Sequence, residues 1–254
     1  MIELHVDGAI ATATLDHAPV NALSPAWVER FGRVLDEVES GPVRVLRIRS
    51  VQPVFCAGAD LVFMASHFES VDGRRGIIAF VSALQGLYAR LESLPAVSIA
   101  QIEGPAMGGG LELALACDFR MICASARIGL PEIRLGLLPG AGGTQRLSRL
   151  AGPAVARRLI LTARSVPADE ALAAGICDWV APAAEVDAAC LAIATRIASF
   201  PADAIAANKR CLAAVADPAR NGFTEELDNT AALLESPTTQ LRVRAFLAGT
   251  SERG

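Results

Sequence analysis

The chain has 254 residues, of which 52% are hydrophobic and 5% aromatic, and its formal net charge is −4. This length suits one large domain, or one domain with a small appendage, and its core must be built mainly from aliphatic and small side chains. The acidic balance lacks the basic footprint of a nucleic-acid-binding protein. Of the 23 basic residues only Lys209 is a lysine, so arginine, backbone N–H groups or helix N-termini must meet any anionic ligand.

The cysteine, histidine and hydropathy patterns exclude further classes of protein. Six scattered cysteines form no C-x-x-C pair, which favours buried free thiols in a reducing compartment. The three histidines have no partner at metal-ligand spacing. The N-terminus lacks the basic start of a signal peptide, and no unbroken apolar run reaches membrane-spanning length. We therefore expect a soluble, cytoplasmic protein with no metal, no membrane contact and no nucleic-acid partner.

Alternation and helical spacing predict an α/β chain. Asp7-Gly8 is a typical turn between two strands, and Ser24-Pro25 supplies the N-cap and the first residue of a helix. The expected elements in chain order are strands at 2–6 and 10–15, a helix at 25–40, a strand at 43–49, a helix at 77–94, a strand at 97–102, a helix at 110–117, and short strands at 119–123 and 127–129. In this arrangement active groups can gather on the turns that follow strands.

Two segments differ from this pattern. Residues 62–75 are irregular and charged, and we expect a mobile surface segment or lid there. After Pro182 the chain becomes nearly all helical and rich in alanine. We therefore predict a core at 1–194 and a helical C-terminal region at 195–254, whose apolar stripes need the core or another subunit as a partner.

The segment Gly108-Gly109-Gly110-Leu111-Glu112 leads a glycine run into a predicted helix. The plain interpretation is a flexible turn followed by an acid that suits the helix dipole. Glycines also let backbone N–H groups approach a ligand closely, and residues 109 and 112 share a helix face because they are three apart. N–H groups placed in this way can hold a developing negative oxygen.

A second acid, Glu132, follows Pro131 and precedes an apolar stretch. Alone it would be a solvated turn residue, which is the usual place of a glutamate. A half-buried position among apolar neighbours would instead raise its pKa and make it a proton donor near neutral pH. Glu112 and Glu132 are therefore candidates for paired carboxylates that divide acid and base work.

Other glycine-rich segments exclude common ligand sites. Residues 140–145 fail the dinucleotide pattern G-x-G-x-x-G because Gln145 stands at its last position. Neither a G-x-x-x-x-G-K-[ST] phosphate loop nor a G-x-S-x-G nucleophile turn occurs. The turn at 55–60 reads as an ordinary tight turn, but its small residues also let a ligand reach the backbone. Carboxylates with backbone donors are the chemistry that remains.

Four segments together resemble the enoyl-CoA hydratase/isomerase (crotonase) family. They are Pro-Val-Asn-Ala-Leu-Ser at 19–24, Phe-Cys-Ala-Gly-Ala-Asp-Leu at 55–61, and the segments at 104–118 and 131–147, in an order and spacing that agree over about residues 1–250. The resemblance implies an α/β superhelix of repeated ββα turns, followed by an α-helical trimerisation region. It also implies a homotrimer, or a hexamer made of two trimers.

The resemblance further implies roles for individual residues. The backbone N–H groups of Ala59 and Gly109 would form an oxyanion hole for an acyl-CoA thioester. Glu112 and Glu132 would be the two acids of a hydratase, and Gly140 would help to hold the water. The residues along the CoA channel would be Val20, Ala22, Ala57, Asp60 and Leu61.

The implied activity is addition of water to trans-2-enoyl-CoA, giving 3-hydroxyacyl-CoA in fatty-acid or related degradation, with no cofactor beyond the CoA of the substrate. Double-bond isomerisation with Glu132 as base is the alternative. A non-catalytic RNA- or protein-binding homologue is a third, against which the acidic balance and the single lysine argue. The chain departs from many members at Val62-Phe63-Met64 and after Ala245-Phe246-Leu247, which affects contacts to the CoA phosphates but not the acids.

Overall fold

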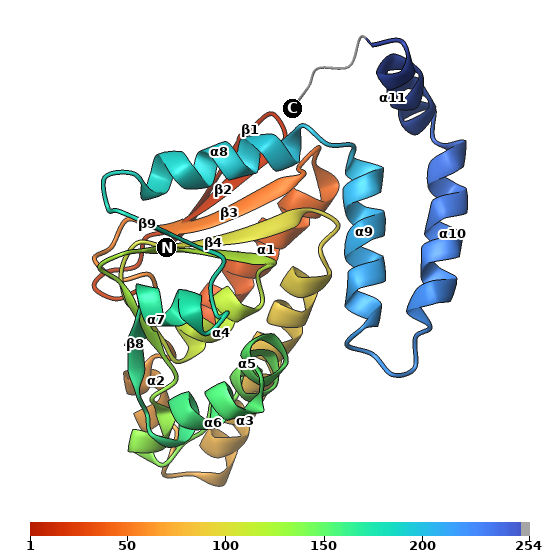
Figure 1. Ribbon diagram of the computed structural model, residues 1–254. Helices are drawn as coiled ribbons and strands as arrows, with labels where there is room; N and C mark the ends of the chain where they lie inside the picture. The colour runs from red at the N-terminus through yellow and green to blue at the C-terminus, as the bar shows by residue number, and fades with distance from the viewer. Residues whose placement is uncertain (250–254) are drawn as a thin grey trace.

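The computed structural model describes residues 1–249, and a six-stranded sheet forms its centre (Figure 1). The order across this sheet is β1 (Ile2–Asp7), β2 (Ile10–Leu15), β3 (Val45–Ser50), β4 (Val97–Ile102), β6 (Phe119–Cys123) and β9 (Trp179–Ala181). β1 and β2 pair antiparallel, as a hairpin must, and the other neighbours pair parallel. A smaller sheet contains β5 (Ala106–Met107), β7 (Arg127–Gly129) and β8 (Ser165–Pro167).

Helices cover both faces of the main sheet. The helices are α1 (Pro25–Ser40), α2 (Leu61–Ala65), α3 (Val71–Ser93), α4 (Gly109–Leu115), the 3₁₀ turn η1 (Glu132–Leu135), α5 (Gly143–Ala151), α6 (Pro153–Leu161), α7 (Ala168–Ala173), α8 (Val186–Ala198), α9 (Ala202–Ala214), α10 (Gly222–Glu235) and α11 (Pro237–Leu247). α8 lies along one face of the sheet, whereas α10 packs beside α9 and α11 continues beyond α10, farther from the sheet (Figure 1).

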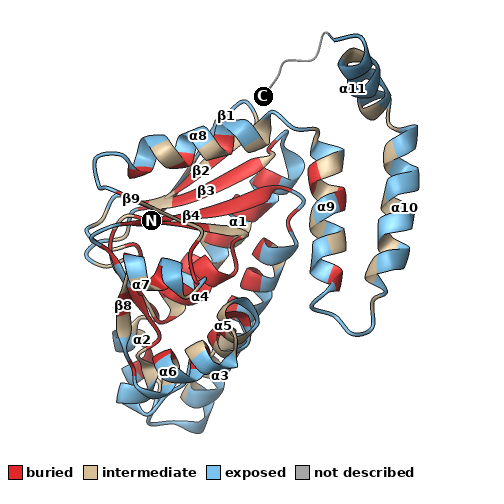
Figure 2. Cartoon of the chain, in the orientation of Figure 1, coloured by how far each residue is buried: buried red, intermediate tan, exposed pale blue. Residues whose placement is uncertain are grey.

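Strand alternation divides the buried side chains between two clusters. Leu46 and Ile48 face a large cluster that includes α1, α3 and α4, whereas Val45 faces a smaller cluster beneath α8. The strands of the centre are largely buried, while α10 and α11 are mostly exposed (Figure 2). The predicted α/β architecture is therefore confirmed.

The expectation of irregular structure at 62–75 is wrong for 62–65 and 71–75, which are helical, and holds only for the turn at 66–70. The side chain of Asp60 caps α2, accepting from the backbone N–H groups of residues 62 and 63. Ser70 caps α3 by accepting from the Gly73 N–H at 2.8 Å, so α3 begins at Val71 rather than at residue 77. Asp72, Arg74 and Arg75 lie on the exposed face of the first turns of α3, so no apolar period marks this part of the helix.

The C-terminal helices are attached to the core at a few places. The division predicted near residue 195 falls inside α8. Lys209 of α9 pairs with Asp118 at 2.5 Å and also donates to the Ala96 carbonyl at 2.8 Å. Within residues 1–249 no single helix is long and apolar enough to span a membrane, and α8 with α9 passes that test only as a pair bent by 101°.

The six cysteines form no disulfide. All six are free thiols, as expected. Five of them are buried as predicted, whereas Cys211 is half-buried.

Candidate active site

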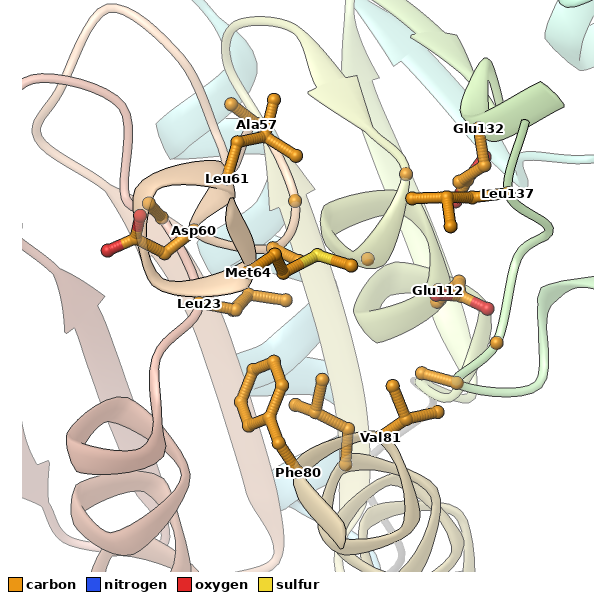
Figure 3. A pocket seen from close by; sticks show the side chains of 18 of the residues that line it. Leu23, Ala57, Asp60, Leu61, Met64, Phe80, Val81, Glu112, Glu132 and Leu137 are labelled. Atoms are coloured by element: carbon orange, nitrogen blue, oxygen red, sulfur yellow. The ribbon is translucent and has the colours of Figure 1, made fainter. Parts of the chain in front are cut away.

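A pocket of about 1160 Å³ lies between α2, α3, the start of α4 and the loop before α5 (Figure 3). Its walls come from five stretches of chain: the loop after β2, the turn into α2, one face of α3, the start of α4, and the segment from η1 to α5. Both predicted acids and both predicted backbone donors line this pocket.

Glu112 lies in the first turn of α4 and is only 3% exposed. Its Oε1 accepts the Gly143 N–H at 2.7 Å, and residue 143 must be glycine because a Cβ there would lie 2.9 Å from this oxygen. Burial raises the pKa of Glu112 to about 7, although the Gly143 N–H lowers it in part. The Glu112 carboxyl can therefore gain or lose a proton near neutral pH.

Glu132 begins η1 and points into the same pocket from the other side of the α4 N-terminus (Figure 3). Within residues 1–249 its buried Oε2 has no hydrogen-bond partner. Burial raises the pKa of Glu132, and its negative charge also raises the pKa of Glu112. Because the charge of Glu132 disfavours ionisation of Glu112, the two acids can differ in protonation, which is the condition for separate acid and base roles.

Two backbone N–H groups converge beside these acids. Leu23 exchanges hydrogen bonds with the Gly58 carbonyl and the Asp60 N–H, both at 2.9 Å, so the Ala59 N–H between them points the other way. A Cβ placed on Gly109 would lie 3.7 Å from Ala59 N, and Gly109 opens α4, where no intrahelical acceptor exists. Neither N–H donates to a protein acceptor within residues 1–249. The pair therefore fits a developing oxyanion.

Gly140 lines the pocket on the loop that leads into α5. Its carbonyl accepts Gln85 Nε2 at 2.6 Å, and the next carbonyl, of Ala141, accepts Arg146 Nη1 at 3.0 Å. Arg146 is itself held by Glu92 at 3.0 Å. These contacts hold the loop that presents Gly143 to Glu112.

The residues predicted along a CoA channel also line the pocket: Val20, Ala22, Ala57, Asp60 and Leu61. The Asp60 carboxylate is used as a helix cap and points away from the two glutamates (Figure 3). Among residues 1–249 no group of three or more His, Cys, Asp or Glu side chains could hold a metal ion.

An apolar wall opposite the acids was not predicted. It consists of Leu23, Met64, Phe80, Val81 and Leu84, whereas Leu137 lies beside Glu132 (Figure 3). The spacing of 80 and 84 indicated one helix face, but the sequence has no signal that this face lines a pocket rather than the core.

Comparison with known proteins agrees with this geometry. The family model for enoyl-CoA hydratase/isomerase matches residues 5–252. The chain belongs to this family. A short-chain-enoyl-CoA hydratase from Clostridium acetobutylicum is 36% identical over 213 residues, which cover 82% of this chain and 79% of that protein. The mitochondrial methylglutaconyl-CoA hydratase of Mus musculus is 43% identical over 162 residues, 63% of this chain and 50% of that protein.

Solved structures of the family have the same fold. The crystal structure of an enoyl-CoA hydratase from Bacillus anthracis superposes with a TM-score of 0.91 at 32% identity and covers 98% of this chain and 96% of its own. Several curated relatives are longer, and the match spans about half of their length. The enoyl-CoA hydratase/isomerase family acts on acyl-CoA thioesters, which suits a pocket with paired backbone donors.

Proposed function

We propose that this protein is an enoyl-CoA hydratase, which adds water across the 2,3 double bond of a trans-2-enoyl-CoA. The observation that carries the proposal is the meeting of two acids of raised pKa, Glu112 and Glu132, beside two unpaired N–H groups in one pocket. A hydratase needs both acids, because a proton leaves the water and another is delivered to the substrate.

The mechanism follows from the placement of these groups. The N–H groups of Ala59 and Gly109 hold the thioester oxygen and polarise the conjugated system, so that C3 becomes electrophilic. Glu112 takes a proton from a water that attacks C3, and the Gly140 backbone helps to hold that water. Glu132 gives a proton to C2, and the double bond becomes a single bond. The proton gained by Glu112 makes up for the one lost by Glu132 before the next turnover. The reaction is redox-neutral and needs no cofactor beyond the CoA of the substrate.

The apolar wall suggests which acyl groups fit. Met64, Phe80 and Leu84 are buried or nearly so, and they form the side of the pocket away from the acids. A carboxylate on the acyl chain would lie near two glutamates. The one arginine of the lining, Arg134, is exposed and donates through Nη2 to the Ala163 carbonyl at 3.0 Å. We infer that the apolar wall receives an uncharged hydrocarbon part of the acyl group.

The first experiment follows loss of the enoyl-thioester absorbance with short- and medium-chain trans-2-enoyl-CoA. We expect fast loss, 3-hydroxyacyl-CoA as product and oxygen from labelled water in that product. Binding without any loss would argue against hydration, and turnover of 3-enoyl-CoA without water incorporation would indicate an isomerase that uses Glu132 as base.

Replacement of either acid tests the assignment directly. Glu112→Gln and Glu132→Gln keep the side-chain volume but cannot exchange a proton, so each should lower kcat by about 10²–10⁴. Glu170→Gln is the matched control, since Glu170 pairs with Arg164 at 2.6 Å outside the pocket. Hydration at the parental rate by either pocket variant would refute that acid's role.

We also infer that the protein assembles as a homotrimer or as a hexamer of two trimers. Neither α10 nor α11 contains a buried residue. The large apolar side chains that these helices and the end of α9 expose are Leu212, Phe223, Leu227, Leu234, Leu241, Val243, Phe246 and Leu247. An apolar surface of this kind supports burial against another subunit.

A further inference from the structure

The only tyrosine of the chain lies directly beneath the oxyanion site. Tyr88 is on the buried face of α3 and is 0% exposed. Its hydroxyl donates to the Gly109 carbonyl at 3.0 Å. Gly109 is the residue whose N–H is one of the two pocket donors, so a buried hydroxyl and a candidate oxyanion donor share one residue.

This hydrogen bond is additional to those of the helix. A carbonyl in the first turn of a helix accepts from the N–H four residues further on. The hydroxyl therefore uses the second acceptor position of the Gly109 carbonyl. It connects α3 to α4 at the turn that carries both Gly109 and Glu112.

The glycine run needs contacts of this kind to fix its backbone. Three consecutive glycines have no side chains to restrict their backbone, and Gly108 lies in the left-handed region at φ +53°. Gly108 is held by its N–H to the Gly129 carbonyl at 2.9 Å, and Gly110 packs against Cys56. Gly109 is confined by Leu23, whose Cδ1 would lie 2.7 Å from an added Cβ, and by Tyr88.

The hydroxyl keeps its proton under all ordinary conditions. Burial raises the pKa of Tyr88 well above 10, and the nearby Cys56 and Glu112 groups raise it further. It thus remains a donor while Glu112 changes its charge.

We propose that Tyr88 is a positioning residue, which fixes the Gly109 backbone so that its N–H is aimed at the thioester oxygen. This inference rests on the proposed acyl-CoA chemistry of the pocket. The tyrosine does not touch the substrate. It acts through Gly109, and it lies on the same face of α3 as Phe80 and Leu84, which line the apolar wall. One helix thus shapes the acyl pocket and supports the oxyanion donor.

The test is Tyr88→Phe, which removes one oxygen and keeps the ring in its buried site. The control is Ser98→Ala, because the Ser98 hydroxyl is also fully buried and donates to Asp118 at 2.9 Å, away from the pocket. Both variants lose one buried hydroxyl and should melt at a somewhat lower temperature than the parent protein.

Two readouts separate positioning from a purely structural role. With a short-chain trans-2-enoyl-CoA, Tyr88→Phe should lower kcat about tenfold with KM within about twofold, less than the roughly 10²–10³ expected for loss of an oxyanion donor. A chromophoric cinnamoyl-CoA thioester, whose absorption moves to longer wavelength as its carbonyl is polarised, should show a smaller red shift on binding to this variant when spectra are recorded by rapid mixing, before hydration removes the chromophore. Ser98→Ala should leave kcat and the red shift unchanged.

Parental kcat and a full red shift in Tyr88→Phe would overturn the inference, as would equal losses in both variants. The proposed function is tested separately by the parent protein. If that protein shifts the chromophore but hydrates no enoyl-CoA, hydration is refuted, whereas the comparison of red shifts still decides the role of Tyr88.

Discussion

Glu112 is a rare case of a glutamate that is almost completely buried. Burial and the acidic neighbour raise its pKa, and they outweigh the lowering by the backbone N–H of Gly143, at 2.7 Å, and, to a smaller extent, by the backbone of Ala141 and the charge of Arg146. A buried carboxylate with so little compensation is costly to ionise. Such perturbed acids are concentrated at functional sites, where an ability to change protonation near pH 7 is useful.

This burial has a consequence for stability. The pKa of Glu112 is about 7 in the folded protein and 4.5 in the unfolded chain. Its contribution to the stability of the fold is therefore fully present below pH 4.5, and it is lost as the pH rises through about 7. Between pH 4.5 and 8 the free energy of unfolding of the parent should therefore fall, relative to Glu112→Gln, by up to about 3 kcal/mol. Urea unfolding of both proteins at several pH values measures this, and parallel pH profiles would contradict the buried, raised-pKa carboxyl.

At the scale of elements, α2 shows how one side chain turns an irregular-looking segment into a helix. Asp60 supplies two backbone N–H groups with an acceptor, at 2.9 and 3.1 Å. α2 has only five residues, so it depends strongly on this cap. Met64, which lies on α2, forms part of the apolar wall. The Asp60 cap therefore stabilises the helix that places Met64 in the pocket wall.

Capping and direct contact with CoA are two different roles for Asp60. Asn keeps the cap and removes the charge, whereas Ala removes both. If capping dominates, Asp60→Ala should lose about 1 kcal/mol of stability and raise KM several-fold, and Asp60→Asn should resemble the parent. Steady-state kinetics with one enoyl-CoA, together with thermal unfolding, compare the two. A KM that rises equally in both variants would assign the charge itself to substrate binding.

At the scale of the whole molecule, the chain has an inner part with a core and an outer part without one. α9 is tied to the sheet by Lys209 and by the buried Ile205, whereas α10 and α11 bury none of their residues. Helices of this length are marginal in water without tertiary contacts, so their stability needs a further partner. A second copy of the chain is the partner we propose.

Charges on the outer helices test this proposal. The double variant Phe223→Glu with Leu227→Glu alters two side chains of α10 that are 82% and 72% exposed. We expect light scattering to show a trimer or hexamer for the parent and a folded monomer for the variant, because like charges would be buried at the interface. Val51→Glu is the control, since Val51 is 57% exposed but lies outside the helical tail. A monomeric parent, or an unchanged variant, would refute the assembly.

Local signals allowed much of the fold to be predicted. The Asp7-Gly8 turn and the Ser24 cap act within a few residues, and the hairpin and α1 occur where they indicate. The start of α3 was mistaken because the cap at Ser70 is followed by charged residues, whose exposed face carries no apolar period. The pocket face of α3 could not be predicted, since a helix buries the same residue types against a core as against a ligand.

The order of residues establishes which groups are available: two acids, a glycine run and small residues at two turns. Their meeting in one pocket depends on contacts between segments that are far apart in the chain. The Ala59 and Gly109 N–H groups come together because Leu23 and Ala59, far apart in the chain, form a bridge beside α4. Likewise, the pKa of Glu112 depends on burial and on a contact from Gly143, and the support from Tyr88 depends on the packing of α3 against α4. Burial and hydrogen-bond direction are properties of long-range contacts, so residue type alone does not specify them.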